Sequence, residues 1–585
     1  MPAQATDFIP AEFDASDWPQ IEALLDDLQN RTVSSASDLE RWLADRSELE
    51  AACDEAMADR YISMSRRTND KAAQRAYTEF VEKIPPKLKP RLFELDKRFV
   101  ELAGEHKLDE HRYEVILRDT KAEVELFRPD NVPIQTELAK LAQEYGQITG
   151  EMTVEFEGEE KTLPQMAVFQ ESPDRQVREA AWKTVSERRL QDADKLDELL
   201  DKMVERRHKM ALNAGFDNFI GYAFKSKMRF DYGPEHCQAF HEACEKHVVP
   251  FNKRLSERRR EALGVRSLRP WDLSVDPKGR GPLRPFNGGH ELFDKSMRAF
   301  EKLDNRLAEM FEVLGEGLHG EGEAEGVYLD LDSRKGKAPG GYQYMRDYTR
   351  RPFIFMNAAG VQRDVETMVH EAGHAFHSML LVEEPLLHYR HAPIEFCEVA
   401  SMAMEFMTMP YWGGPDGFYP DETDHGRAVR QHIESSVSIL SWIATIDLFQ
   451  HKLYAKPDHS RKERTDTWLE LDDRFGYMGR AQADFSGLNP RFRETTWQRQ
   501  GHLYGSPFYY IEYGIAQLGA MGVWLHSMEK GEKSAIDAYI EALALGGSRP
   551  LPELFKAAGL PFDFGPDIVG RLVDRAEREL EKLPE

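Results

Sequence analysis

Apolar and polar positions along most of the chain follow a helical period. From about residue 37 to residue 147 apolar residues recur every three or four positions, and charged segments with the same period run on past residue 210. The pair Pro85-Pro86 predicts a break in the first stretch. A Pro/Gly-rich loop is expected from Arg266 to Gly289, with helices resuming near residue 291. The pattern therefore predicts a mainly α fold.

Short runs of β-branched and aromatic residues predict a few strands among these helices. Residues 152–156 and 161–163, separated by a turn at Gly158, form a hairpin signal. Three further runs predict a small sheet, at residues 327–330, 342–345 and 353–356. Gly340 and Gly341 would let another backbone approach this sheet closely, although a simple turn explains them equally well.

The length of the chain predicts more than one structural unit. With 585 residues it exceeds what a single hydrophobic core usually organises, so two or more lobes are expected. We place a soft boundary near residue 165. It separates an N-terminal helical region, residues 1–165, from a second region, residues 166–585.

The segment His370-Glu371-Ala372-Gly373-His374 follows the last predicted strand and has the spacing of a metal site on a helix. Residues at i and i+4 share one helix face, so both imidazoles can reach one Zn²⁺, with Glu371 beside a metal-bound water. Asp364 is the expected N-cap. Apolar residues supply the buried stripe of this helix, at Val365, Met368, Val369, Ala372 and Phe376. The alternative to a metal site is a pair of histidines on an ordinary helix, on its surface or in the core.

A third ligand must come from another part of the chain, because a catalytic zinc normally has three protein ligands. His377 would have to bend inward from the same helix, so a packed or hydrogen-bonded role is favoured for it. Residues 393–405 predict a second helix, on which Glu398 can close the site while Glu395 competes for the role. Glu405 lies on the same face as Glu398 and could accept the second N–H of a liganding histidine.

An aromatic segment near the C-terminus offers hydrogen-bond donors. His502 lies in a loop, and Ser506-Pro507 predicts the N-cap and first position of a helix. Three tyrosines fall on one side of that helix, namely Tyr509, Tyr510 and Tyr513. Phenol and imidazole groups held near a metal could stabilise a developing oxyanion. Tyrosines at a helix start are nevertheless more often core residues.

The sequence segments HEAGHAFH and CEVASMAME resemble the motifs of the thimet oligopeptidase and oligoendopeptidase F family of zinc metallopeptidases. The resemblance favours Glu398 as third ligand after His370 and His374, and it gives His502 and Tyr513 the oxyanion role. This chain departs from the family pattern at Ile511, which stands where a middle tyrosine is expected, and it doubles Tyr509-Tyr510 instead. The choice of a second tyrosine therefore stays open, with Tyr510 included among the catalytic candidates. The resemblance also implies a two-lobed, helical, zincin-like fold with a deep central channel.

The function implied is a zinc endopeptidase with one Zn²⁺ per chain and Glu371 as general base. Its substrates would be short, unstructured oligopeptides. A carboxypeptidase or dipeptidyl carboxypeptidase is the first alternative and needs a cationic anchor, for which the chain offers Arg346, Arg350, Arg351, Arg493 and Arg499. A non-catalytic helical binding protein with a structural zinc is the second. It is disfavoured because a structural site does not require Glu371.

Composition narrows the partners and the compartment. A net charge of −26 argues against nucleic acid, which needs a dominant basic surface. The four cysteines lack any Cys-x-x-Cys spacing and are expected to be reduced thiols. We see neither a signal peptide nor a run approaching 18 apolar residues, so a cytoplasmic protein without membrane contact is expected. The sequence leaves the oligomeric state open.

Overall fold

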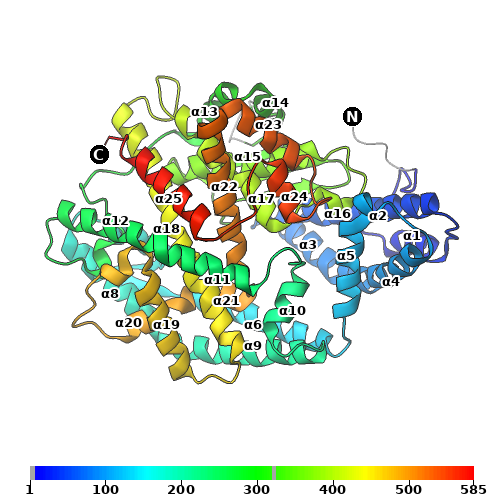
Figure 1. The fold of residues 1–585 in the computed structure, drawn as a ribbon, viewed down its shortest axis with the longest axis horizontal. Coiled ribbons are helices and arrows are strands. Elements are labelled where there is room, and N and C mark those ends of the chain that lie inside the picture. Colours follow the sequence, from blue (N-terminus) through cyan, green and yellow to red (C-terminus); the bar gives the residue numbers. More distant parts are fainter. Residues whose placement is uncertain (1–6, 319–324, 585) are drawn as a thin grey trace.

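Helices dominate the computed structural model, which describes residues 7–318 and 325–584 (Figure 1). A helical share of 68% confirms the mainly α prediction. In Figure 1 the first helices form a group on one side, while the helices from α13 onward and those from α6 to α12 build the larger part.

The N-terminal helices pack around their own apolar cluster, which includes Trp42, Leu95 and Phe99. Leu386 and Tyr389, far along the chain, also enter this cluster and attach it to the rest of the molecule. The break predicted at Pro85-Pro86 is confirmed, because one helix ends at Lys83 and the next begins at Pro85. These helices are α1 (Trp18–Asn30), α2 (Ala36–Arg66), α3 (Lys71–Lys83), α4 (Pro85–Glu105) and α5 (Glu110–Leu126). Helix α6 (Asn131–Gly150) follows, and its Ile134 belongs to the larger core cluster.

The predicted hairpin is also present. Strands β1 (Thr153–Phe156) and β2 (Glu159–Thr162) pair antiparallel around Gly158, whose φ of +81° suits a residue without a Cβ. The helices that follow are α7 (Ala167–Gln170), α8 (Arg175–Gln191), α9 (Ala193–Asn213), α10 (Phe219–Ser226), α11 (Pro234–Ala243), α12 (Val249–Ala262), α13 (Gly288–Leu303) and α14 (Asn305–Leu314).

The second sheet has the strand order β3-β5-β4 and leads directly into the motif helix. Strand β5 (Arg351–Ala358) is central, pairing parallel with β3 (Leu329–Asp332) and antiparallel with β4 (Tyr342–Arg346). Residues 352–356 of β5 are buried on both faces, which explains their unbroken apolar run. All three strands lie within two or three residues of their predicted positions.

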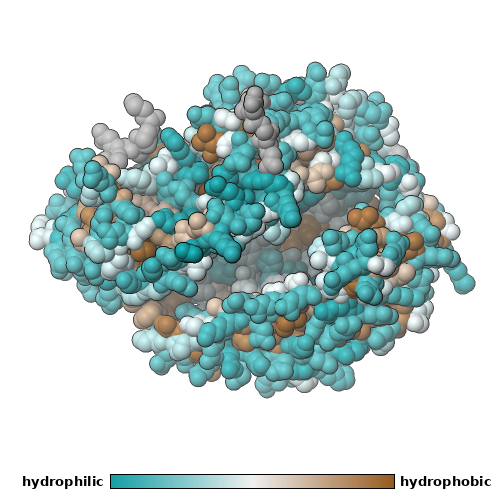
Figure 2. Space-filling view, turned by 180° about the vertical axis from the view of Figure 1, so that it is seen from behind, coloured by the Kyte–Doolittle hydropathy of each residue, from teal (hydrophilic) through white to brown (hydrophobic). Residues whose placement is uncertain are grey.

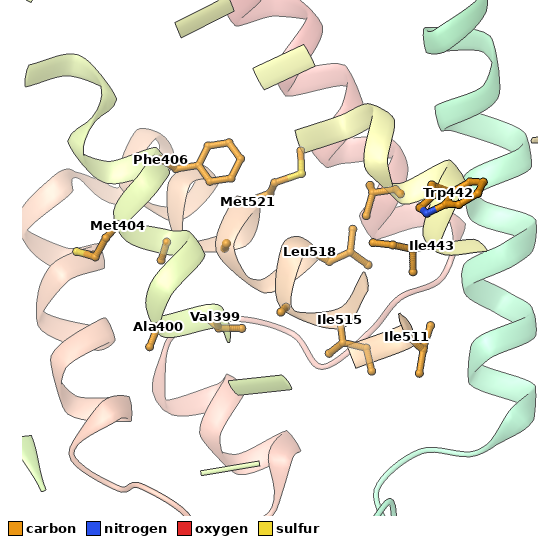
Figure 3. Close-up of a cluster of buried hydrophobic side chains, with 14 of the residues drawn as sticks. Val399, Ala400, Met404, Phe406, Trp442, Ile443, Ile511, Ile515, Leu518 and Met521 are labelled. Atoms are coloured by element: carbon orange, nitrogen blue, oxygen red, sulfur yellow. The ribbon is translucent and has the colours of Figure 1, made fainter. Parts of the chain in front are cut away.

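The remaining helices carry the C-terminal half. The motif helix is α15 (Gln362–Leu380). Helices α17, α18 and α22 bury apolar faces against one another, as Figure 3 shows for Val399, Ile443 and Ile515. The helices after α15 are α16 (Leu387–Arg390), α17 (Ile394–Thr408), α18 (Glu422–Ala455), α19 (Arg461–Phe475), α20 (Arg491–Glu494), α21 (His502–Gly505), α22 (Tyr510–Lys530), α23 (Glu532–Leu543), α24 (Leu551–Ala557) and α25 (Pro566–Leu580).

A deep hollow crosses the face seen in Figure 2, between the upper and lower parts of the molecule. The lower part contains α6, α8, α9, α19 and α20, and the upper part contains α13, α15, α17 and α23 (Figure 1). This arrangement agrees with the two-lobed fold expected. The division at residue 165 stays a prediction. Over the described residues, none of the helices combines the length and apolarity needed to cross a membrane.

Two helix starts differ from the prediction, and His502, expected in a loop, begins the short helix α21. Helix α15 begins at Gln362, and Asp364 lies inside its first turn, where its carboxylate accepts hydrogen bonds from the backbone N–H groups of Val361 and Ala359 at 3.0 and 2.8 Å. Helix α22 begins at Tyr510 instead of Pro507. Phe508 has a φ of +61°, a left-handed conformation that no α-helix contains, so the helix starts only after it.

Candidate functional site

Helices α15 and α17 are in close backbone contact at Gly373, inside the motif. A Cβ on Gly373 would lie 2.5 Å from the carbonyl oxygen of Ala400 and 2.7 Å from the Cα of Ser401. Contacts below 3.0 Å are not found in real proteins, so only glycine fits between these backbones. The glycine therefore lets α17 lie directly against α15, with Glu398 one half-turn away from the contact.

This contact brings His370, His374 and Glu398 together. One nitrogen of each imidazole and one oxygen of the carboxylate all lie within 4.8 Å of one another. Glu398 Oε2 is 3.5 Å from His370 Nε2 and 3.8 Å from His374 Nε2. Ligand atoms around a tetrahedral zinc are separated by about 3.3 to 3.8 Å, given bond lengths near 2.1 Å. These three residues could therefore hold a metal ion, and their role as ligands stays a prediction.

A buried network orients the first imidazole. Glu405 Oε1 lies 2.7 Å from His370 Nδ1, which leaves Nε2 directed toward the cluster. His432 of α18 is 2% exposed, and its Nδ1 lies 3.7 Å from Glu405 and 3.6 Å from Glu366. A histidine held at Nδ1 by a carboxylate presents a fixed Nε2 lone pair, as metal-binding histidines do.

Glu371 projects toward the sheet and is 8% exposed. The backbone of Gln343 in β4 lies near its carboxylate and favours the ionised form. Burial raises the pKa of Glu371 to about 7, while the neighbouring His370 opposes the rise. The group can therefore exist in both protonation states near neutral pH, which suits proton transfer.

The two competing ligands lie elsewhere. Glu395 accepts a hydrogen bond of 2.6 Å from the hydroxyl of Tyr232. His377 is 5% exposed, and its ring packs edge-on against Phe396 with centroids 6.4 Å apart. Burial lowers the pKa of His377 to about 4, so it is a neutral packed residue. Neither belongs to the group formed by His370, His374 and Glu398.

The predicted aromatic donors form one cluster. The ring of His502 lies 5.6, 5.0 and 6.1 Å from those of Tyr509, Tyr510 and Tyr513. Gln500 Nε2 is 2.7 Å from His502 Nδ1. Burial, followed by the charge of Lys227, lowers the pKa of His502, so its imidazole is neutral at pH 7 and can donate from one nitrogen only.

The three tyrosines do not face the same way. Burial raises the pKa of Tyr513 and of Tyr509. The negative charge of Glu398 raises the pKa of both hydroxyls further. Burial raises the pKa of Tyr510 as well, but its hydroxyl interacts with Trp442 and Gln500. The hydroxyls of Tyr509 and Tyr513 are therefore the two within electrostatic reach of the candidate metal site.

Sequence reasoning missed some residues of this region. Gly373 was visible only as the small residue inside the motif, and its close contact with α17 became visible only in the packed structure. His432 carried no local signal, because it lies on a long helix distant in the chain. Lys227 Nζ lies 5.1 Å from the ring centroid of Tyr509 and 3.5 Å from Glu512 Oε1, which places a cation beside the tyrosines.

Known proteins resemble this chain over its whole length in structure and over part of it in sequence. PZ peptidase A, solved with an inhibitor, is 28% identical with a TM-score of 0.83, and the match covers 99% of each chain. Oligoendopeptidase-F from Enterococcus faecium, at 14% identity and a TM-score of 0.63 over 97% of each chain, shares the fold.

Among curated proteins, an oligoendopeptidase F homolog from Borreliella burgdorferi is 27% identical over 51% of this chain and 48% of its own length. One from Lactococcus lactis subsp. lactis is 22% identical over 71% of this chain and 65% of its own length. Each match thus spans less than two thirds of the relative. The family model described as Peptidase family M3 matches residues 168–565, which include the whole candidate site. The chain therefore belongs to peptidase family M3.

Proposed function

We propose that this chain is a zinc-dependent endopeptidase that hydrolyses short, unstructured oligopeptides. One observation carries the proposal: two imidazoles and a carboxylate converge within 4.8 Å, beside a buried fourth group, Glu371, which is not one of the three. A structural metal site has no use for such an extra carboxylate. Membership of peptidase family M3 supports the same activity.

The donor set fits one zinc ion per chain. Two histidine nitrogens and one glutamate oxygen are a ligand combination of catalytic zinc sites, which leave a fourth position open. When bound, Zn²⁺ supplies a Lewis acid and lowers the pKa of a coordinated water toward about 7. His370 is held ready by Glu405, and the backbone contact at Gly373 fixes the position of Glu398.

The side chains around the three metal-binding residues are assigned the proton transfer and the stabilisation of the oxyanion. The Glu371 carboxylate takes a proton from the attacking water and passes it to the leaving amine nitrogen. The hydroxyl of Tyr513 and the imidazole of His502 donate hydrogen bonds to the oxygen that becomes negative at the cleaved carbonyl. Tyr509 packs edge-on against Tyr513, with ring centroids 5.1 Å apart, and orients it. Tyr510 is assigned a packing role.

The hollow between the two lobes supports the size limit on substrates (Figure 2). We expect such a space to admit an extended peptide and to exclude a folded domain. Strand β4 forms an edge of the sheet β3-β5-β4 next to α15, and a peptide backbone could lie along it. Names of the relatives, oligoendopeptidase F among them, agree with oligopeptide substrates.

Two substitutions test the assigned roles by metal analysis and peptide hydrolysis in parallel. Glu371→Gln should retain zinc and lose at least about 100-fold in activity, because only the proton carrier is removed. Glu398→Gln should lose zinc. Glu395→Gln, the same chemical change one helical turn away, is the matched control and should keep both. Full activity of Glu371→Gln would exclude the proposed base.

Blocked substrates separate the alternatives. A peptide with an amidated C-terminus should be cleaved as fast as the free acid, because an endopeptidase does not need the terminal carboxylate. Arg346 and Arg493, two possible carboxylate anchors, are paired with Asp59 and Asp472 at 2.6 Å. Loss of cleavage on amidation would favour a carboxypeptidase. Bound zinc without any turnover would favour the structural-zinc alternative.

A further inference from the structure

A second group of metal-binding side chains lies between α11 and α18. Cys237 and His241 are four residues apart on α11, and Asp447 and His451 are four residues apart on α18. Each pair therefore projects from one helix face. The two helices pack together, as Figure 1 shows (green α11, yellow α18), so the two pairs face each other.

Three of these side chains have the spacing of a ligand set. One atom each from Cys237, Asp447 and His451 all lie within 4.8 Å of one another. His451 Nε2 is 3.4 Å from Asp447 Oδ2, within the range of about 3.3 to 3.8 Å between ligand atoms of a tetrahedral zinc site. His241 Nε2 lies 2.8 Å from the same oxygen and can orient the carboxylate by donating a hydrogen bond.

The polar atoms in this group are buried and incompletely satisfied. Cys237 and Asp447 are 0% exposed. Over the described residues, Asp447 Oδ1 and His451 Nε2 have no hydrogen-bond partner. A buried carboxylate oxygen without a partner costs about 1 to 3 kcal/mol or more, so such atoms need an explanation. Both atoms belong to the three residues that converge.

Charge balance indicates which bound ion would satisfy the unpaired atoms of Asp447 and His451. A thiolate, a carboxylate and a neutral imidazole sum to −2, so a divalent cation makes the buried group neutral. Nearby Arg229 does not supply that charge, because it pairs with Glu512 at 2.6 Å. Thiolate and imidazole donors select zinc-like transition metals over Ca²⁺ and Mg²⁺, which prefer oxygen.

We propose that Cys237, Asp447 and His451 form a second, structural metal site for Zn²⁺ or a similar transition-metal ion, with His241 as the positioning residue. A cysteine binds such an ion as the thiolate, so metal binding at this site releases a proton. The proposal is independent of the peptidase activity.

The position of the site suggests what it stabilises. The ring of His451 packs on Phe508 with centroids 5.1 Å apart, and the neighbouring Gln450 accepts a hydrogen bond of 2.7 Å from the Phe508 N–H. Phe508 is the left-handed residue that precedes Tyr509 and the start of α22. A metal bound between α11 and α18 would hold this turn, and with it the tyrosine cluster, in place.

Metal stoichiometry of the full-length protein tests the proposal directly. We expect two zinc equivalents in the parent protein. One should remain in the double variant His370→Ala/His374→Ala, whose second site is untouched. A parent with one equivalent and a double variant with none would overturn the proposal. This comparison does not depend on whether a variant at Cys237 folds.

Cobalt substitution identifies the ligand. Only the second site contains a thiolate, so the Co²⁺-loaded protein should show a sulfur-to-metal charge-transfer band in the near ultraviolet. Cys237→Ser should abolish this band. Cys244→Ser, a buried thiol in the same region, and Cys397→Ser, next to Glu398, are matched controls and should keep it. Persistence of the band in Cys237→Ser, or its loss in either control, would refute the assignment.

Discussion

Substituting Gly373 by alanine tests how closely metal binding depends on helix packing. The new Cβ would lie 2.5 Å from the carbonyl oxygen of Ala400, a backbone atom that no side-chain rotation can move away. Reaching ordinary contact at 3.4 Å requires α17 to retreat by about 0.9 Å. Glu398 lies two residues before Ala400 and moves with it. Metal-ligand distances tolerate only about 0.2 Å.

Replacing glycine by alanine should change the stability of the protein in opposite directions at Gly373 and at Gly146. Alanine normally stabilises a helix interior by about 1 kcal/mol relative to glycine, and Gly146 of α6, with no atom within 4 Å of its Cβ position, should follow that rule. Gly373→Ala should instead lower the free energy of unfolding by about 1 to 2 kcal/mol, since overpacking costs about 1 to 3 kcal/mol. It should weaken zinc binding by about 10- to 100-fold.

The assay combines competition with a zinc chelator, peptide hydrolysis and denaturant unfolding for the parent, Gly373→Ala and Gly146→Ala. Activity of Gly373→Ala should recover with excess zinc if only affinity is reduced. Parental zinc affinity and stability in Gly373→Ala would show that α17 is not held by this contact, and the reasoning would fail.

Three further predictions concern single groups. Tyr513→Phe should lower kcat by about 10²- to 10³-fold with zinc retained, because one hydrogen-bond donor to the oxyanion is lost. Tyr510→Phe should keep kcat within a few-fold of the parent value. Equal losses of kcat in the two variants would contradict the different surroundings of the two hydroxyls. Glu405→Gln should weaken zinc binding by about 10- to 100-fold without removing a ligand, measured by chelator competition; unchanged affinity would show that His370 is oriented by other contacts. Burial opposes ionisation of Asp330, but Arg334, Lys337 and Arg66 outweigh it and hold its pKa at about 2. This pKa lies below the value near 3.9 of an unfolded chain, so ionised Asp330 should contribute about 2 kcal/mol to the free energy of unfolding above pH 4. The contribution should be lost as the pH falls through 2. Asp330→Asn should remove this part of the pH dependence of unfolding.

Local sequence patterns were sufficient for the parts of this protein that depend on neighbouring residues. The i, i+4 spacing of His370 and His374, the apolar stripe of their helix and the buried strand before it follow from periodicity alone. Helix starts were less well predicted. Asp364 and Ser506 are both good N-cap residues, yet α15 begins before Asp364 and α22 begins after Ser506. Asp364 acts from inside the first turn, where its carboxylate accepts the N–H groups of Val361 and Ala359, and the turn before α22 is held by Gln450 of α18, which binds the Phe508 N–H.

Tertiary structure decided which distant side chains meet. Glu395 and Glu398 both lie on the predicted second helix, and the sequence preferred Glu398 only partly through the family resemblance. In the structure Glu398 lies beside the two histidines, whereas Glu395 accepts a hydrogen bond from Tyr232. His241 and Asp447, 206 residues apart, meet because α11 packs on α18. Spacing along one helix is set by local backbone geometry, whereas the approach of two helices depends on how the whole chain packs its core, which local patterns do not specify.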